Sequence, residues 1–426
     1  MRLAALLCVA VLALPLPVLS ATIHVPADQL TIQAGINTAL DGDTVLVAPG
    51  TYFENVVIDH TVTLLSEAGP EMTTIDGQNV GTVVHIESGV DHVTVEGFRL
   101  THGNAFEGGI ASHGNYTVIR RNIVEHNESF GDAAVISARA TSITEDNLIQ
   151  DNTCLKGTGA AVVSGRFERN IVRDNFGPSG FYNVLVFNAN SFAWNLVVGN
   201  DQGSNEVTFR GGGSIHHNTI IRAFPTVATV VLQSPQGRPY EFHNNVILHG
   251  NGPGVDCDLS GADVIRCNNI WGAGPSFAND CAGLDGAEGN FSADPSFCDP
   301  SQWDYHLTAD SPCAPGSSPL DCELIGAFPV GCGIVGLPSA DAPIAGLRLT
   351  VIPNPFRGMA RFELGSIAQG RALNIFDTQG RLVEQLQRQD GHWSWTPGSA
   401  VPAGVYFARP EGSAVGTEPV KFLYLR

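Results

Sequence analysis

The strongest candidates for acid–base chemistry are two aspartates in the stretch VDCD at residues 255–258. Asp256 and Asp258 are two positions apart, so in a β-strand both side chains project to the same face. Glycoside hydrolases use two carboxyl groups about 5–9.5 Å apart, which such a pair could supply. The neighbouring segments, around Gln233 and Cys267, bring no further acids. The pair alone therefore does not predict a complete hydrolytic centre.

A second candidate is a pair of histidines in similar segments, IHHNTII (215–221) and FHNNVIL (242–248). His216 and His243 could hold a divalent metal, but no carboxylate or third ligand recurs beside them. We therefore expect solvated surface at this place and predict no metal site. Nucleophile-elbow, zinc-protease and phosphate-loop motifs are absent from the sequence.

The charge balance excludes several classes of partner. The formal net charge is −20, and Lys156 and Lys421 are the only lysines. An acidic, lysine-poor surface repels phosphate backbones and anionic lipids, so we expect no nucleic-acid partner. It also disfavours a polyanionic glycan, unless a divalent cation bridges the charges.

Residues 1–20, MRLAALLCVAVLALPLPVLS, are typical of a secretory signal peptide. The apolar run is interrupted by two prolines, so we expect no transmembrane segment once the signal is removed, and a secreted or outer-surface location. Eight cysteines then remain, and an even number in an exported chain predicts disulfides, with about 105 possible pairings. The disulfide candidates are Cys154, Cys257, Cys267, Cys281, Cys298, Cys313, Cys322 and Cys332.

The elements that must position these residues come from a repeat. Segments such as VIRRNIV (118–124), RFERNIV (166–172) and FAWNLVV (192–198) recur about every 24 residues and align on an asparagine. A period of this length is typical of a stacked array. The aligned asparagines are Asn122, Asn147, Asn170, Asn195, Asn218, Asn245 and Asn269.

Each repeat unit has room for about three short strands and no helix. One coil per unit, with parallel pairing to the next coil at about 4.8 Å, describes a parallel β-helix over residues 21–332, here of about eleven coils. Before its first predicted strand, Thr31 can cap a short helix whose residues Ile32, Ile36 and Leu40 share one apolar face. Such a helix would cover an exposed sheet edge.

The repeated asparagine has a structural explanation. Asn tolerates left-handed backbone conformations, and stacked carboxamides can hydrogen-bond from coil to coil. We therefore interpret the column as a structural ladder and expect a second, partial ladder at Asn127, Asn152, Asn175 and Asn200. The charged residues just before the first ladder, Arg120, Glu145 and Glu168 and their neighbours Arg121, Asp146 and Arg169, should pair across adjacent coils, with Arg120 and Arg121 facing acids one coil on.

The period stops after a linker, GIVGLPSADAP (333–343). Residues 344–426 contain six alternating apolar segments separated by turns, which predict a small Ig-like β-sandwich. The chain is thus expected to be all-β, with a β-helix followed by a sandwich.

Two family resemblances support this organisation. The opening IQAGINTALDGDTVLVAPGTYFENVVI (32–58) and the repeats resemble the right-handed parallel β-helix of pectate-lyase-like proteins, and residues 290–328 look like that fold's final coils. The segments PNPF, IFDTQGRLV and GVYFAR resemble the C-terminal sorting domain of type IX secretion and FlgD Ig-like modules. The second resemblance implies export through the secretion machinery and attachment at the surface.

The first resemblance places the functional face on the first strand of each coil, where relatives bind glycans. It implies an extracellular polysaccharide as partner, no cofactor, and calcium only if the chain is a lyase. The sequence leaves a polysaccharide lyase or hydrolase and a structural spacer or adhesin open as alternatives, because this fold hosts all three. The outward candidates are His85, Glu87, His113, Arg139, Asn188, Thr208, Arg210, Gln233, Asp256 and Asp258.

Overall fold

The computed structural model divides the chain into two compact units, Met1–Gly336 and Leu337–Arg426. The expected signal peptide (1–20, except Ser20), Lys156 and the expected linker (333–343) lie outside the described residues. The described residues are 20–130, 135–139, 141–155, 159–177, 182–200, 205–222, 227–234, 238–259, 263–319, 322–332, 349–352, 356–364, 372–377, 381–387, 393–398, 401–410 and 420–425.

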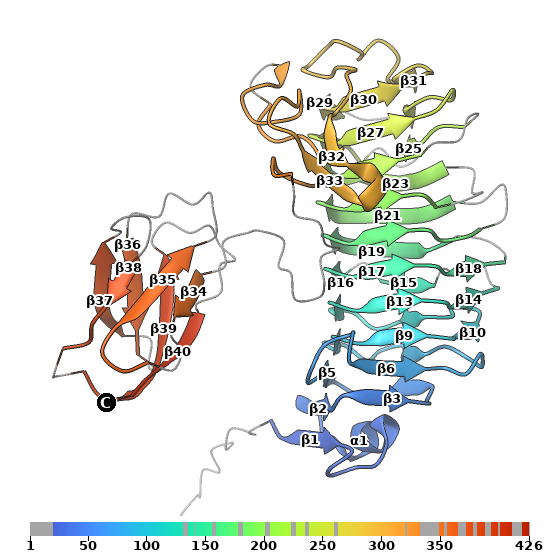
Figure 1. Cartoon of the computed structure of the whole chain (residues 1–426). Coiled ribbons are helices and arrows are strands. Elements are labelled where there is room, and N and C mark those ends of the chain that lie inside the picture. The colour runs from blue at the N-terminus through green and yellow to red at the C-terminus, as the bar shows by residue number, and fades with distance from the viewer. Residues whose placement is uncertain are drawn as a thin grey trace, which may run out of the picture. The chain divides into compact units, whose positions relative to one another are not determined.

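The first unit is a parallel β-helix, as the repeat predicted, with about ten turns where about eleven coils were expected (Figure 1). Each coil contributes two strands to an 18-stranded sheet and one strand to a 10-stranded sheet. The first strands of the coils are β4 (Val56–Ile58), β7 (Val84–Ile86), β11 (Ile110–Ser112), β15 (Ile136–Ala138), the starts of β19 (Ala161–Glu168), β21 (Tyr182–Ala193) and β23 (Asn205–His216), then β25 (Val230–Gln233), β28 (Val255–Asp258) and β31 (Phe277–Asn279).

The second strands run beside them in the same sheet, and three coils join both strands into one long element. The second strands are β1 (Thr22–Val25), β2 (Asp43–Val47), β5 (Val62–Ser66), β8 (Thr94–Glu96), β12 (Val118–Arg120), β16 (Ile143–Glu145), the ends of β19, β21 and β23, then β26 (Tyr240–His243) and β29 (Val264–Arg266).

The third strands form the 10-stranded sheet, which we call the third face. They are β3 (Gly50–Tyr52), β6 (Thr73–Asp76), β9 (Arg99–Thr101), β13 (Ile123–Glu125), β17 (Leu148–Gln150), β20 (Ile171–Arg173), β22 (Leu196–Val198), β24 (Thr219–Ile221), β27 (Val246–His249) and β30 (Asn269–Gly272). A small sheet of β10 (Asn104–Ala105), β14 (Glu128–Ser129) and β18 (Thr153–Cys154) follows in three coils.

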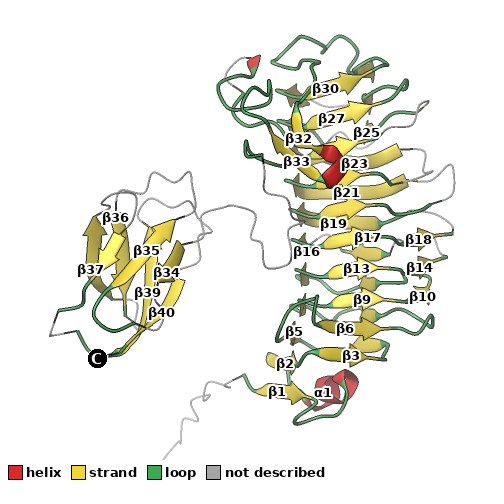
Figure 2. Ribbon diagram, in the orientation of Figure 1, coloured by secondary structure: helices red, strands yellow, loops and turns green. Residues whose placement is uncertain are grey.

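A short helix closes the N-terminal end of the stack, and Figure 2 shows it in red below the strands. Helix α1 spans Ile32–Thr38, and the Thr31 hydroxyl accepts a hydrogen bond from the Ala34 amide at 3.1 Å, as predicted. Ile32 and Ile36 are fully buried. Leu40, expected on the same face, is exposed because the helix ends before it, and Ala39 takes the buried position instead.

The first asparagine ladder is present and has one more rung than expected. Each ladder side chain accepts the backbone N–H of the preceding rung at about 3 Å, as from Asn122 to Asn147 and from Asn147 to Asn170. The prediction was wrong at one position: the rung is Asn268, and the column continues to Asn290. Asn269, the second asparagine of the same pair, faces the other side and binds the Ala293 backbone.

The backbone explanation of the ladder also needs correction. The left-handed residue is the one before each rung, for example Arg121 (φ 54°), Asp146 (φ 56°) and Cys267 (φ 55°). The rung itself does not adopt a positive φ, so asparagine is required for its hydrogen bonds and not for its backbone conformation. The same relation holds at Gly97 (φ 82°), where the next residue, Phe98, donates to Asn122.

The second ladder, Asn127 to Asn200, is confirmed, with each amide bonded to the next carboxamide at 2.9–3.2 Å. The charge pairs are confirmed for Arg169, which bridges to Glu145 at 2.6 Å and to Asp146 at 2.8 Å on the coil before it. Arg120 and Arg121 instead both contact Glu96 on the preceding coil, at 2.7 and 2.8 Å.

Residues 291–332, of which 320 and 321 are not described, are called the tail; after a last parallel bridge from Phe291 to Asn269, its described residues form no further coil. Strands β32 (Phe297–Asp299) and β33 (Asp304–Leu307) pair with each other in antiparallel fashion, with the 3₁₀ turn η1 (Pro300–Gln302) between them. The tail folds back over the third face (Figure 1). Apolar side chains on that face, including Ile171, Leu196 and Val198, pack against Tyr305 of the tail. The expectation of final coils at 290–328 is therefore wrong beyond Phe291.

Three disulfides hold the C-terminal end of this unit: Cys257–Cys281, Cys267–Cys322 and Cys298–Cys332. The expectation of disulfides is wrong for Cys154 and Cys313, which are buried thiols. They lie far apart in the fold, because Cys154 belongs to β18 whereas Cys313, in the tail, accepts a hydrogen bond from Asn269 in β30.

The second unit contains two antiparallel sheets, which fit an Ig-like sandwich. Its core includes Trp393, Trp395, Phe362 and Phe422, all nearly inaccessible to solvent. Six strand segments were predicted and seven strands are present among the described residues, because one predicted segment, ALNIFDTQGRLVEQL (372–386), contributes to both β36 and β37. The strands are β34 (Leu349–Ile352), β35 (Ala360–Leu364), β36 (Ala372–Phe376), β37 (Leu382–Gln387), β38 (Trp393–Trp395), β39 (Gly404–Pro410) and β40 (Val420–Tyr424).

Candidate functional site

The register of the first strands places the sequence-predicted candidates in two neighbouring columns. One column passes through His85, Thr208 and Asp256, which are linked by the pairings of successive coils. The other contains Phe187, Arg210, Gln233 and Asp258 in register. Glu87, His113 and Arg139 each directly follow the last paired residue of β7, β11 and β15, and so continue that column. We call this surface the first-strand face.

Four polar residues meet at the N-terminal end of the first-strand face. The imidazole Nε2 of His113 lies 2.9 Å from the Glu107 carboxylate, and Nε2 of His85 lies 3.7 Å from Glu87. The two imidazole rings are in edge-to-face contact, with centroids 5.0 Å apart. Glu107 is mostly buried, whereas the other three side chains are half-buried or exposed. This arrangement can exchange a proton between a histidine and a carboxylate next to solvent.

A second polar group lies four coils further on. Arg210 donates to the Gln233 carboxamide at 3.0 Å, and its guanidinium lies over the Phe187 ring at 5.9 Å. Asn188, in a bulge with φ 47°, accepts a hydrogen bond from Arg238 at 3.3 Å. A planar cation, two amides and an aromatic ring are groups that hydrogen-bond hydroxyls and stack on sugar rings.

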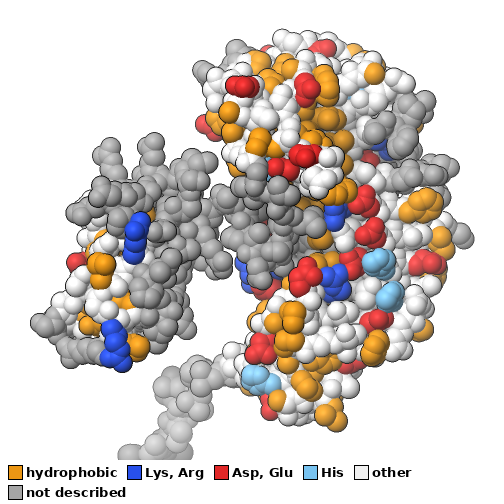
Figure 3. Space-filling model, in the orientation of Figure 1, with side chains coloured by type: hydrophobic (Ala, Val, Ile, Leu, Met, Phe, Trp, Pro, Cys, Tyr) orange, Lys and Arg blue, Asp and Glu red, His pale blue; other side chains and the backbone are white. Residues whose placement is uncertain are grey.

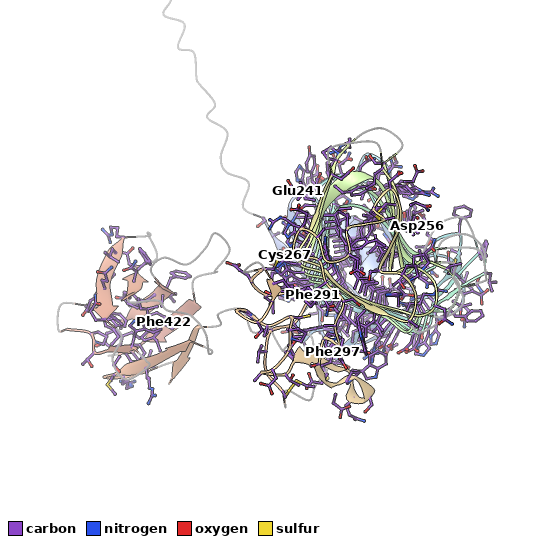
Figure 4. All side chains as sticks on the ribbon, turned by 90° about the horizontal axis from the view of Figure 1, so that it is seen from above. Glu241, Asp256, Cys267, Phe291, Phe297 and Phe422 are labelled. Atoms are coloured by element: carbon purple, nitrogen blue, oxygen red, sulfur yellow. A yellow bond between two sulfur atoms is a disulfide. The ribbon has the colours of Figure 1, made fainter. Side chains whose placement is uncertain are left out.

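Asp256 and Asp258 differ in environment. Asp256 is half-buried and accepts a hydrogen bond from the Asn279 amide at 2.5 Å, whereas Asp258 is exposed. Figure 4, which looks along the stack, shows Asp256 on a different side of the coil from Phe297 of the tail. The tail thus leaves this part of the first-strand face uncovered.

The first-strand face is not polar along its whole length. Between the two polar groups the central column carries Ala111, Ser137, Val162 and Leu185. Thr208, expected to face a ligand, is fully buried, as is Leu185 beside it. Arg139 is exposed and lies beside this small and apolar stretch. The structure therefore brings His85, Glu87 and His113 together at one end and Asn188, Arg210 and Gln233 at the other.

The histidine pair from the second strands is not simple solvated surface. His216 and His243 stack in parallel with ring centroids 5.2 Å apart, and His217 stacks on Trp194 at 4.1 Å. Burial, together with the neighbouring imidazole His243, lowers the pKa of His216, and burial lowers the pKa of His217 to about 3. His216 and His217 are therefore held neutral, and the rings of this group pack against one another and against Trp194. Among the residues that the structure describes, no group of three or more His, Cys, Asp or Glu side chains could hold a metal ion.

Three groups of polar residues were not predicted from the sequence. Glu107 lies in a turn outside the strand pattern, so only the fold shows that it contacts His113. Glu206 is fully buried between Asn200 and Asn183 at 2.6 and 3.1 Å, and burial raises its pKa to about 7. Arg222 directly follows β24, His249 is the last residue of β27, and both line a pocket. For Arg222 and His249, the signal in the sequence was a polar residue at a position that other coils fill with Asp, Gly or His.

The third face also carries polar side chains, and Figure 3 shows acidic, basic and histidine side chains gathered over the middle coils. Arg99 contacts Glu125 and Glu71, and Gln150 donates to Glu125 at 2.7 Å. Arg173 continues the row through Gln150 at 2.6 Å and lies over the Trp303 ring of the tail at 4.2 Å. These groups bind one another, so we interpret the row as structural.

No protein-family model and no curated protein matches this sequence. The described part of the chain contains no helix long and apolar enough to cross a membrane.

Proposed function

We propose that the protein is exported and binds an extracellular polysaccharide along the first-strand face. The observation that carries this proposal is the register: two separate groups of hydrogen-bonding side chains lie on one straight face, four coils apart. At about 4.8 Å per coil, this separation is roughly 19 Å. A linear polymer can contact both groups at once, which raises its avidity over that of a single sugar.

The chemistry of the two groups suits a neutral glycan better than a polyanionic one. At one end, carboxylates and imidazoles can accept hydrogen bonds from sugar hydroxyls. At the other end, Arg210 and Gln233 offer guanidinium and amide donors. Glu87, Asp256 and Asp258 would repel a polyanion, and the net charge of −20 adds to that repulsion.

Binding is tested with the purified mature protein and a panel of neutral and acidic polysaccharides, with and without calcium, by affinity electrophoresis. His113→Ala and Arg210→Ala each remove one end of the face, and we expect each to weaken binding by about tenfold, or ~1.4 kcal/mol. Arg381→Ala, on the second unit, is the matched surface control. Equal retardation of all variants and wild type would place the binding surface elsewhere.

A second candidate function is polysaccharide cleavage, favoured by the contact between His113 and Glu107. This pair could act as a general base, with a lyase requiring a cation such as calcium to neutralise the substrate carboxylate. The same panel decides between the two functions. Absorbance of unsaturated sugar products or new reducing ends would identify an enzyme, whereas affinity without products would identify a binding protein. Loss of product formation in Glu107→Gln would assign the chemistry to this pair.

Export and surface attachment are proposed for the second unit. The three disulfides suit an oxidising compartment, which supports an extracellular location. Deleting residues 344–426 should leave the protein inside the cell envelope, as measured by fractionation. Normal surface display of the shortened chain would refute the sorting role and would leave a structural spacer as the remaining interpretation of the second unit.

A further inference from the structure

The third face carries an open pocket of about 450 Å³ near its C-terminal end. Three side chains from one column, Ile221, Leu248 and Trp271, form its apolar wall. The next position along the chain supplies Arg222 and His249 from adjacent coils. The Trp271 side chain is partly exposed, so part of the indole ring is accessible from solvent.

The two polar side chains of the pocket are both more than nine-tenths buried, with Arg222 9% and His249 7% exposed. His249 Nδ1 lies 3.0 Å from the Gly252 carbonyl oxygen, which can only accept, so Nδ1 carries the proton. The other ring nitrogen, Nε2, is then an acceptor. It is buried and has no hydrogen-bond partner among the described residues. A buried acceptor without a donor is destabilising, so the free Nε2 points to a ligand that donates a hydrogen bond to it.

Two glycines leave the space that the His249 ring occupies. A Cβ on Gly272 would lie 2.7 Å from the ring carbon Cδ2, and one on Gly254 would lie 3.0 Å from it. A side chain at either position would displace the ring. Burial also lowers the pKa of His249, which keeps the imidazole neutral and Nε2 available as an acceptor.

Arg222 provides the charge of the pocket. It interacts electrostatically with the buried carboxyl of Glu206. A guanidinium has five N–H donors in a planar fork, so Arg222 can share them between its protein partners and an acceptor in the pocket. Register places Arg222 and His249 on consecutive coils, about 4.8 Å apart along the stack.

We propose that this pocket binds a small hydroxylated carboxylate with an apolar ring face. Its carboxylate accepts from Arg222, its hydroxyl donates to Nε2 of His249, and its ring packs against Trp271. The site lies on a different sheet from the first-strand face, so it is independent of the proposed polysaccharide binding.

The test is isothermal titration calorimetry of the full mature chain with 3- and 4-hydroxybenzoate. Benzoate lacks the hydroxyl and methyl 4-hydroxybenzoate lacks the charge. We expect at least one hydroxybenzoate to bind and each incomplete analogue to bind about tenfold more weakly, because each loses one buried polar contact. The absence of heat from both hydroxybenzoates at millimolar concentration, or equal affinity for all four compounds, would overturn the proposal.

Variants locate the site. His249→Phe keeps an aromatic ring but removes the acceptor, and it should abolish the preference for hydroxybenzoate over benzoate. Trp271→Ala changes a partly exposed side chain and should weaken all four compounds while leaving the fold intact, so it serves even if His249→Phe does not fold. His243→Phe is the matched control and should bind like wild type. Wild-type affinity in Trp271→Ala would show that the ligand binds elsewhere.

Discussion

Asn170 shows how one side chain satisfies several backbone groups in this fold. Its Oδ1 accepts the backbone N–H and the side-chain amide of Asn147, both at 3.0 Å. Its own amide donates to the carbonyls of Thr144 and Glu168 at 2.9 and 3.1 Å. The residue is fully buried, so none of these groups could turn to water instead.

Replacing Asn170 by alanine should therefore lower the free energy of unfolding by roughly 3 kcal/mol or more, because several buried groups lose partners together. Urea denaturation followed by circular dichroism measures the change. Asn37→Ala is the control, since Asn37 is exposed and its carboxamide oxygen accepts from Gln33 at 2.9 Å. A cost below about 1 kcal/mol would mean that water or repacking replaces the rung.

Glu206 ends the second ladder, where it accepts from Asn200. Burial raises its pKa from 4.5 to about 7, so the folded chain holds this proton more tightly than the unfolded chain. Between these pH values the folded state binds more protons, and stability falls as pH rises. The stability present below pH 4.5 is lost as pH rises through the folded pKa, by roughly 3 kcal/mol in total.

The variant Glu206→Gln should remove this dependence. Relative to wild type, its free energy of unfolding should increase by roughly 3 kcal/mol between pH 4.5 and 8. Urea titrations of both proteins at several pH values measure the difference, in which the contributions of all other groups cancel. A constant difference across this range would show that Glu206 does not titrate in the folded protein.

At the scale of elements, the third face is polar in its first coils and apolar where the tail covers it. The column through Glu125, Gln150 and Arg173 becomes apolar at Val198 and Ile221. The tail begins its cover where this change occurs, because Trp303 lies over Arg173 and Tyr305 packs on Val198. Hydrogen bonds from Asn244 to Leu324 and from Ala327 to Thr219 hold it further along.

The disulfide Cys267–Cys322 ties the tail to the stack across 55 residues. The double variant Cys267→Ser/Cys322→Ser should destabilise the tail by about 2–4 kcal/mol. Hydrogen exchange should become faster in residues 303–330 and remain slow in the coils before Arg173. Removing Cys257–Cys281, which links adjacent coils, is the control and should not accelerate exchange in the tail. Unchanged tail protection in the first variant would show that apolar packing alone holds it.

At the scale of the whole molecule, the two units have separate cores. The β-helix core and the core around Trp393, Trp395 and Phe422 share no residue. A chain ending at Gly336 should therefore unfold at the same temperature as the β-helix in the full-length protein. Differential scanning calorimetry of both chains measures this, with one transition lost from the shorter one. A lower melting temperature of the remaining transition would show that the second unit stabilises the first.

The β-helix itself could be predicted from the sequence because its stabilising interactions repeat. A hydrophobic residue before each asparagine and another after it recur with the coil, so local pattern and global fold carry the same information. The predicted ladder position was wrong at Cys267-Asn268-Asn269. Two adjacent asparagines fit the pattern there, and only the backbone decides which one joins the ladder. The capping helix, the two ladders and the two-unit organisation follow from the same kind of local signal.

The sites depended on contacts between residues distant in the sequence. Alternation along a strand predicted that His85, Glu87 and His113 face outward, but only the stacked coils and a turn bring Glu107 to His113. Similarly, Arg222 and His249 belong to different coils, and their burial depends on how the third face and the following loops pack. The disulfide pairing and the folding back of the tail were decided in the same way. Periodic local interactions determined the scaffold, whereas non-repeating contacts, which leave no periodic trace in the sequence, determined the candidate sites.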